Sequence, residues 1–154
     1  MARNLAQELL RPASVLREDE TVAVATRALL EGTLRALPVV DGRERFTGVF
    51  GEREFLAALF PGYVGDLHSA AFITAALDDT IERRAACAGE PIRRHMTRDH
   101  VEVPSGASDL QLAETFLHHR VLVVPVTDHG RVVGVITRSE FFAALAERFL
   151  SSRT

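Results

Sequence analysis

The pattern of apolar and polar positions occurs twice along the chain. A shift of 87 positions places residues 37–41 (LPVVD) on residues 124–128 (VPVTD), and beyond one extra residue in the first loop the shift becomes 86. The second shift places Gly48 on Gly134 and residues 54–55 (EF) on residues 140–141 (EF). A fixed period of this kind indicates a duplicated structural unit, so we expect two repeats of one fold.

Each repeat is predicted to contain one hairpin. Two β-rich runs flank a short polar turn, and the runs are residues 35–40 and 45–50 in the first repeat and residues 121–127 and 131–136 in the second. The turns contain Asp41-Gly42 and Asp128-His129-Gly130. Glycine between two apolar runs is typical of a tight hairpin turn. A further short strand is expected ahead of each hairpin, at residues 14–16 and 101–103.

Helical periodicity marks two more segments of each repeat. Ahead of the hairpin, apolar residues recur at helical spacing, with Val22, Ala25 and Leu29 in the first repeat and Leu112 and Phe116 in the second. After the hairpin, an amphipathic helix is expected over residues 53–60 and 139–150. The order strand, helix, strand, strand, helix therefore occurs twice and predicts an α+β fold.

The repeats and their connection define the expected organisation: residues 1–60 are the first repeat, residues 61–90 a helical linker, and residues 91–154 the second repeat. Neither repeat is long enough to bury an adequate core alone. We therefore expect one module in which the two sheets pack together around a pseudo two-fold axis. The apolar faces expected to meet there are those of Val39, Val49, Val126 and Val135.

Composition excludes several classes of protein. With 47% hydrophobic and 25% charged residues the chain matches an average soluble globular protein. A net charge of -3, with the basic residues scattered, gives no footprint for nucleic acid, and no apolar run reaches the roughly 18 residues of a membrane span. The single cysteine, Cys87, excludes an internal disulfide and fits a reducing compartment, so we expect a cytoplasmic protein with no nucleic-acid or membrane partner.

The order of elements, the Pro-Val after an apolar pair, the Asp-Gly hairpin and residues 134–140 (GVITRSE) resemble tandem cystathionine β-synthase-type (CBS) domains. The resemblance covers about residues 5–60 and 90–150. It implies two domains that meet through their sheets and leave two clefts, which often bind AMP, ADP, ATP or S-adenosylmethionine. It also implies a regulatory module that commonly dimerises. Because no enzyme or channel accompanies the two repeats, we expect the regulated protein to be a separate, unidentified chain.

The junction between the last strand and the last helix of the second repeat is the main candidate site. A hydroxyl at a helix start, next to free backbone N–H groups and the positive end of the helix dipole, favours a phosphate. Thr137 supplies that hydroxyl, Arg138 adds a guanidinium that pairs with phosphate, and Glu140 is placed to accept ribose hydroxyls. The same Thr and Glu spacing also forms a helix cap, so both interpretations stay open.

Other positions of the motif complete the expected site. We expect Gly134 and Ile136 at the same cleft, with the adenine ring against Val101, Val124 and Pro125. The first repeat has Gly51 in place of the hydroxyl residue, with Glu54 and Pro38 at the matching positions, so its cleft is expected to be weaker or empty. Both glutamates replace the aspartate that is usual in the resembled family.

No metal ligand set or catalytic motif stands out in the sequence. The six histidines have no zinc-type spacing, and the acidic residues Asp78, Asp79 and Glu82 of the linker are either a solvated helix start or a divalent-ion site. We therefore expect no required cofactor, no metal and no enzymatic activity. The alternative to a ligand sensor is a dimeric scaffold with degenerate clefts.

A homodimer is expected from the closing helices. They carry more apolar surface than one intramolecular face needs. The residues are Phe55, Leu56, Leu59, Phe141, Phe142 and Leu145. In the resembled family these helices form the dimer contact.

Overall fold

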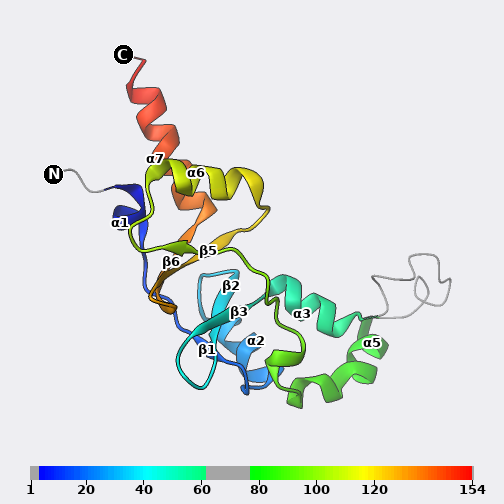
Figure 1. The fold of residues 1–154 in the computed structure, drawn as a ribbon. Helices are drawn as coiled ribbons and strands as arrows, with labels where there is room; N and C mark the ends of the chain where they lie inside the picture. The colour runs from blue at the N-terminus through cyan, green and yellow to red at the C-terminus, as the bar shows by residue number, and fades with distance from the viewer. Residues whose placement is uncertain (1–3, 62–76, 154) are drawn as a thin grey trace.

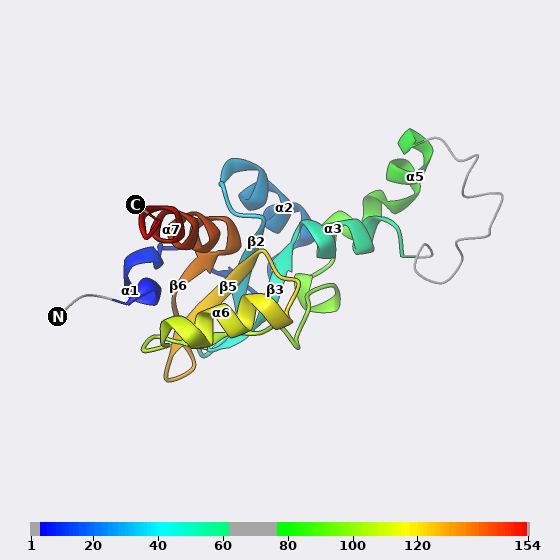
Figure 2. The same cartoon turned by 90° about the horizontal axis from the view of Figure 1, so that it is seen from above.

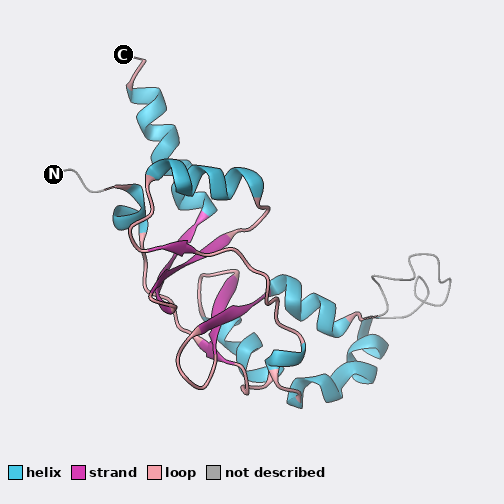
Figure 3. Cartoon of the chain, in the orientation of Figure 1, coloured by secondary structure: helices cyan, strands magenta, loops and turns pink. Residues whose placement is uncertain are grey.

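The computed structural model describes residues 4–61 and 77–153. Figure 1 shows two lobes, and each is built around a three-stranded sheet. The strands of both sheets lie toward the middle of the molecule and most of the helices lie outside them (Figure 3). The predicted α+β architecture of two repeats packed through their sheets is confirmed.

The two lobes contain the same elements in the same order. The first has β1 (Leu16–Arg17), α2 (Val22–Glu31), β2 (Ala36–Val40), β3 (Phe46–Gly51) and α3 (Glu52–Leu59). The second has β4 (Val103–Pro104), α6 (Asp109–His118), β5 (Val123–Asp128), β6 (Arg131–Thr137) and α7 (Arg138–Ser151). In each sheet a short parallel strand pairs with the first strand of the hairpin, so β2 and β5 are the central strands.

Side-chain caps set the starts of the helices. Thr21 accepts a hydrogen bond from the backbone N–H of Val24 at the start of α2. Ser108 and Gln111 form a reciprocal capping box at the start of α6, as the sequence predicts. Each cap satisfies a backbone donor that the helix itself leaves without a partner.

The two hairpins turn differently because the first loop is longer. In the second hairpin His129 and Gly130 have φ values of 51° and 82°, the left-handed pair that a two-residue type I′ turn requires. In the first, the carboxylate of Asp41 accepts bonds from the N–H groups of Arg43 and Arg45, at 2.8 and 3.1 Å. The extra residue of this loop explains the change of the repeat shift from 87 to 86.

Each repeat encloses a separate core between its sheet and its helices. The first core contains Leu16, Val22, Ala25, Leu37, Val39, Phe50, Ile92 and Met96. The second contains Leu5, Ala6, Val103, Ala107, Leu112, Val124, Val126, Ile136 and Phe141. Both cores include residues from outside their own βαββα unit, and these residues show how the chain crosses between the lobes.

The chain exchanges two short segments between the repeats. Helix α1 (Leu5–Leu9) precedes the first repeat but packs on α6, α7 and β6 of the second, and it lies beside α7 in both Figure 1 and Figure 2. Arg11 then pairs with Val135 of β6 through two backbone hydrogen bonds of 3.0 and 2.9 Å. In the same way Thr97, which precedes the second repeat, pairs with Val49 of β3 through two bonds of 2.9 Å.

Two glycines make room for the exchanged segments. A Cβ atom on Gly134 would lie 2.6 Å from the carbonyl oxygen of Arg11, and one on Gly48 would overlap the carbonyl oxygen of Thr97. Both contacts are too close for any side chain. Gly48 and Gly134, which the repeat shift places on each other, therefore lie at equivalent positions. Each is next to the segment that crosses from the other repeat.

The faces of the sheets that meet differ in part from those expected. Val39 and Val126 point into the two separate cores, because alternate residues of a strand face opposite sides. Val49, Val135, Pro38 and Pro125 are almost completely buried but belong to neither core. Since β2 contacts β5, these residues form the contact between the sheets, with the prolines in place of the two expected valines.

The described part of the linker is helical. It contains α5 (Leu77–Arg84) and the 3₁₀ helices η1 (Ala85–Gly89) and η2 (Ile92–Arg94), whereas residues 62–76 of the expected linker lie outside the described residues. Asp78, Asp79 and Glu82 are exposed on α5, and the described residues contain no group of three side chains placed to hold a metal ion. Within the described ranges no helix is long and apolar enough to cross a bilayer.

Candidate functional site

A cleft lies at the start of α7, where the sequence places the main candidate site. Its volume is about 500 Å³, within the range of small-molecule sites. It is lined by Arg11, the loop residues 33–35, residues 122–123 at the start of β5, residues 137–139 and Phe142. We name it the α7 cleft, and its wall comes from both repeats.

A second cleft of about 480 Å³ lies at the start of α3. This α3 cleft is lined by residues 52–54 and Leu56 of α3, residues 35–36, residues 97 and 99–101, and residues 119–123. The repeat shifts place most lining residues of one cleft on lining residues of the other. The two clefts are therefore related by the pseudo two-fold axis. Arg35, Leu122 and Val123 line both clefts.

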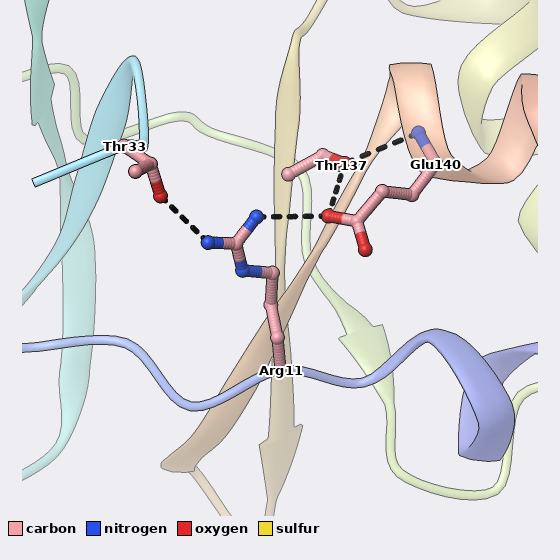
Figure 4. Close-up of polar contacts among 4 residues, drawn as sticks. All are labelled: Arg11, Thr33, Thr137 and Glu140. Atoms are coloured by element: carbon pink, nitrogen blue, oxygen red, sulfur yellow. Dashed lines mark hydrogen bonds and ion pairs between the residues drawn. The ribbon is translucent and has the colours of Figure 1, made fainter.

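Thr137 is the N-cap of α7. Its Oγ1 accepts a hydrogen bond from the backbone N–H of Glu140 at 3.3 Å and donates one to Glu140 Oε1 at 2.8 Å. Figure 4 shows the two side chains together with Arg11, which approaches from the exchanged N-terminal segment. The capping interpretation is therefore realised in this conformation.

Arg11 connects the two repeats at the mouth of the cleft. Its Nη1 donates to Glu140 Oε1 at 2.9 Å, and its Nη2 donates to Thr33 Oγ1 at 2.7 Å (Figure 4). The hydroxyl of Thr137 and the guanidinium of Arg11 hold the pKa of the Glu140 carboxyl below its usual range. Both contacts use Oε1, so Oε2 makes no hydrogen bond with the described residues.

The charges of the α7 cleft are one-sided. Arg11, Arg35 and Arg138 line it, and none of the described residues in its wall is acidic. Arg138 is exposed and makes no side-chain hydrogen bond or ion pair with the described residues. Arg35 forms an exposed ion pair with Glu52 of the other cleft, with Nη1 and Oε1 3.1 Å apart.

The structure brings Thr137 and Arg138 into the wall of the α7 cleft and places Glu140 behind Arg11. Val124, Pro125 and Ile136 are instead enclosed in the protein, with less than 2% of each exposed. They cannot touch an adenine ring, because they lie in the β5–β6 hairpin with their side chains inside a core or between the sheets. Gly134 is covered by residues 10–11, so it too stays away from the cleft.

Val101 packs against the second core but does not line the α7 cleft. It lines the α3 cleft, because the segment that contains it crosses to the first repeat at Thr97. The apolar part of the α7 cleft is formed by Leu34, Leu122, Val123 and Phe142. These residues, and not the ones expected from the sequence, give the cleft its apolar surface.

The junction of the first repeat is closed by its own backbone. A Cβ on Gly51 would lie 2.5 Å from the carbonyl oxygen of Arg35, so no hydroxyl side chain fits there. Glu54 is buried and accepts hydrogen bonds from Gly51 N at 2.9 Å and from Thr97 Oγ1 at 2.8 Å. Pro38 is fully buried between the sheets.

His100 is a further titratable group of the α3 cleft. Its Nδ1 lies 2.8 Å from the carbonyl oxygen of Val101, so Nδ1 carries the proton of this bond. Burial lowers the pKa of His100, and the bond to Val101 partly opposes this effect. Burial therefore favours the neutral form of the ring.

Sequence reasoning missed the contributions of Arg11, Thr33, Arg35 and Phe142 to the α7 cleft. No signal in the sequence identifies Arg11, because the shift of 87 that holds ahead of the first loop places it on Arg98. Its structural counterpart is Thr97, which pairs with Val49 as Arg11 pairs with Val135. Thr33 and Arg35 belong to the first repeat, so only the packing of the sheets places them there.

Comparisons with known proteins agree with this architecture. The CBS domain profile matches residues 6–61 and 92–147. CBSX2 from Arabidopsis thaliana has a TM-score of 0.71 at 19% identity, over 95% of this chain and 96% of that chain. A structure of CBSX2 in complex with AMP has a TM-score of 0.68 at 19% identity, over 94% of this chain and 98% of that chain.

Two further solved structures have the same fold. A CBS domain-containing protein from Kribbella flavida has a TM-score of 0.69 at 22% identity, over 92% of this chain and 97% of that chain. Protein MJ1225 from Methanocaldococcus jannaschii, a proposed archaeal homologue of g-AMPK, has a TM-score of 0.71 at 19% identity, over 92% of this chain and 50% of that chain. At these identities the likeness establishes the fold alone. The two profile matches, however, span more than half of the sequence and coincide with the two structural repeats, so the chain belongs to the CBS domain family, as a pair of CBS domains.

Proposed function

We propose that this CBS pair is a regulatory module that binds an adenosine-containing ligand in the α7 cleft and acts on a separate partner protein. The candidate ligands are AMP, ADP, ATP and S-adenosylmethionine. The observation that carries the proposal is the convergence of Thr137, Arg138 and Arg11 on one cleft of about 500 Å³. A cleft of this size with a few convergent polar groups is the usual form of a small-molecule site.

The proposed pose follows the chemistry of the wall. The phosphate lies at the start of α7, where Thr137, Arg138 and the helix dipole favour an anion. Glu140 accepts a ribose hydroxyl through Oε2, which no described residue uses. The adenine ring lies against Leu122 and Phe142. The complex of CBSX2 with AMP supports an adenine nucleotide as the ligand class, although that protein is only 19% identical.

A homodimer is part of the proposal. Phe142, Leu145 and Phe149 follow helical spacing along α7, and they are 70%, 41% and 63% exposed. Leu56 of α3 is also exposed, whereas Phe141 is buried in the second core and Phe55 packs against the first. The exposed stripe of α7 fits a second copy of the chain, because an apolar face of this length is unfavourable in water.

A dimeric scaffold with unused clefts is the second candidate function. The observation that favours it is the contact of Arg11 and Thr137 with Glu140, which already satisfies one oxygen of that carboxylate. The α3 cleft favours it as well, since Gly51 leaves no hydroxyl and Glu54 is satisfied by the protein.

Calorimetric titration with AMP, ADP, ATP and S-adenosylmethionine separates the two functions. The sensor predicts saturable binding of at least one compound, and a ligand at 100 times its Kd raises the unfolding free energy by about 2.7 kcal/mol. Chromatography after incubation is expected to recover the ligand unchanged, since a sensor performs no chemistry. Absence of binding across the panel favours the scaffold.

A further inference from the structure

The two clefts differ in charge although their backbones are equivalent. The repeat shifts pair Arg138 with Glu52 and Arg35 with Leu122. Arg11 corresponds to Thr97 in the structure, because these two residues pair with the equivalent residues Val135 and Val49. Every arginine of the α7 cleft thus has an uncharged or acidic counterpart in the α3 cleft. The wall of the α3 cleft contains three acidic residues, Glu52, Glu54 and Asp99. They offset its three arginines, which are Arg53, Arg120 and the shared Arg35.

The arginines of the α7 cleft come from three separate parts of the chain. Arg11 belongs to the exchanged segment, Arg35 to the loop before β2, and Arg138 to the first turn of α7. Their convergence follows from the packing of the two repeats. Guanidinium groups bind phosphate oxygens through paired, charge-assisted hydrogen bonds.

The partners of the arginines leave donors available. Arg11 uses one N–H of each terminal nitrogen for Glu140 and Thr33 and has five N–H donors in all. The side chain of Arg138 has no hydrogen-bond or ion-pair partner among the described residues. Arg35 is held by Glu52 through an ion pair whose side chains are 66% and 52% exposed, so that solvent weakens the pair.

We infer that the α7 cleft selects a ligand by its phosphate groups, through Arg11, Arg35 and Arg138, and rejects S-adenosylmethionine. This ligand has a cationic sulfonium centre where a nucleotide has its anionic phosphates. It meets a wall that contains three arginines and no acidic residue, since Glu140 and Glu52, the ion-pair partners of Arg11 and Arg35, lie outside that wall. The α3 cleft does not share this selectivity. The inference deepens the proposed function and rests on it for the identity of the ligand's adenosine part.

Titrations of the wild-type chain with ATP, AMP, adenosine, S-adenosylmethionine and inorganic tripolyphosphate test the selectivity. The expected order of affinity is ATP, then AMP, then adenosine and S-adenosylmethionine, and ATP binding should weaken as salt is added. Arg138→Gln should weaken ATP binding about tenfold and leave adenosine unaffected, because it removes a hydrogen bond to a charged group.

Two further variants sharpen the test. Arg131→Gln, at the exposed start of the same strand β6, removes the same charge outside the cleft and should leave ATP affinity unchanged. Glu52→Gln releases Arg35 from its ion pair and should strengthen ATP binding. Glu52 itself lines the α3 cleft, so Glu52→Gln should not raise ATP affinity if the phosphates make no contact with Arg35.

The outcomes separate the selectivity from the proposed function. S-adenosylmethionine or adenosine binding as tightly as ATP overturns the selectivity and leaves an adenosine sensor. Equal losses in Arg138→Gln and Arg131→Gln overturn it too, since they reveal only long-range attraction. Tripolyphosphate binding that depends on Arg138, without any adenosine compound binding, supports the selectivity and contradicts the proposed function. Absence of all binding overturns both.

Discussion

Glu54 and Glu140 occupy the same position of the two repeats, and each accepts a hydrogen bond from the residue that the exchanged segment brings beside it. Glu54 receives the hydroxyl of Thr97 at 2.8 Å, and Glu140 receives the guanidinium of Arg11 at 2.9 Å. Thr97 and Arg11 are themselves equivalent, because they pair with Val49 and Val135, which the shift of 86 places on each other. The backbone arrangement is thus the same in both repeats, whereas the donor to the glutamate is a neutral hydroxyl in the first and a charged guanidinium in the second.

Acid should remove the stabilisation that Glu140 provides. Its contacts with Thr137 and Arg11 lower its pKa in the folded state, so the stabilisation is present above the unfolded pKa of about 4.3 and is lost as the pH falls through the folded value. Denaturant unfolding of wild type and Glu140→Gln between pH 7 and pH 3 measures this. The two unfolding free energies should converge at low pH, and a constant difference would contradict the assignment.

The exchanged segment makes Gly134 sensitive to any side chain. Gly134→Ala places a methyl group 2.6 Å from the carbonyl oxygen of Arg11 and should lower the free energy of unfolding by about 1–3 kcal/mol. Gly106→Ala is the matched control, since nothing lies within 4 Å of its added Cβ, and it should change stability by no more than about 0.5 kcal/mol. Equal effects of the two changes would show that residues 10–11 move freely.

The repeats and both junctions were predictable because their signals are local. Apolar runs flanking Gly130, and the Thr137 to Glu140 spacing, determine a turn and a helix start within a few residues of themselves. The positions of Val39 and Val126 were predictable too. Residues two apart in a strand face the same side, so Val39 shares the core of Leu37 and Val126 shares the core of Val124.

The composition of the clefts was not predictable in the same way. Arg11 and Thr33 meet Glu140 only because the N-terminal segment crosses to the second repeat and the sheets pack together. Val101 lies in the α3 cleft for the corresponding reason. Such contacts join residues far apart in sequence, and no local preference of the chain encodes them.

The apolar stripe of α7 predicts a dimer in solution. Light scattering at micromolar concentration should report twice the mass of one chain. Phe149→Ser and Leu145→Ser should shift the equilibrium toward the monomer, because they remove apolar surface from the contact. Leu110→Ser, which changes an apolar residue on α6 that is even more exposed, should have no effect. A monomeric wild type would contradict the proposed dimer.

The double role proposed for Thr137 gives a further prediction, in which ligand affinity and stability must be measured separately. Thr137→Ala removes the N-cap of α7 and should cost about 1 kcal/mol of stability whether or not a ligand binds. It should also weaken nucleotide binding roughly tenfold, because a hydrogen bond to a charged phosphate is lost. Thr137→Ser keeps the hydroxyl and should preserve both properties.

Glu140→Gln completes the test of the proposed pose. The amide keeps the size of the side chain and one acceptor oxygen, but it loses the charge that holds Arg11 and cannot accept both ribose hydroxyls. Adenosine affinity, measured by calorimetry, should therefore fall in Glu140→Gln, while tripolyphosphate should bind at least as tightly as it does to wild type, because the change releases Arg11 from its ion pair. If nucleotide affinity is unchanged in both Thr137→Ala and Glu140→Gln while ligand-free stability falls, the two residues serve only to cap α7, and the ligand, where one binds, is held by other groups of the cleft.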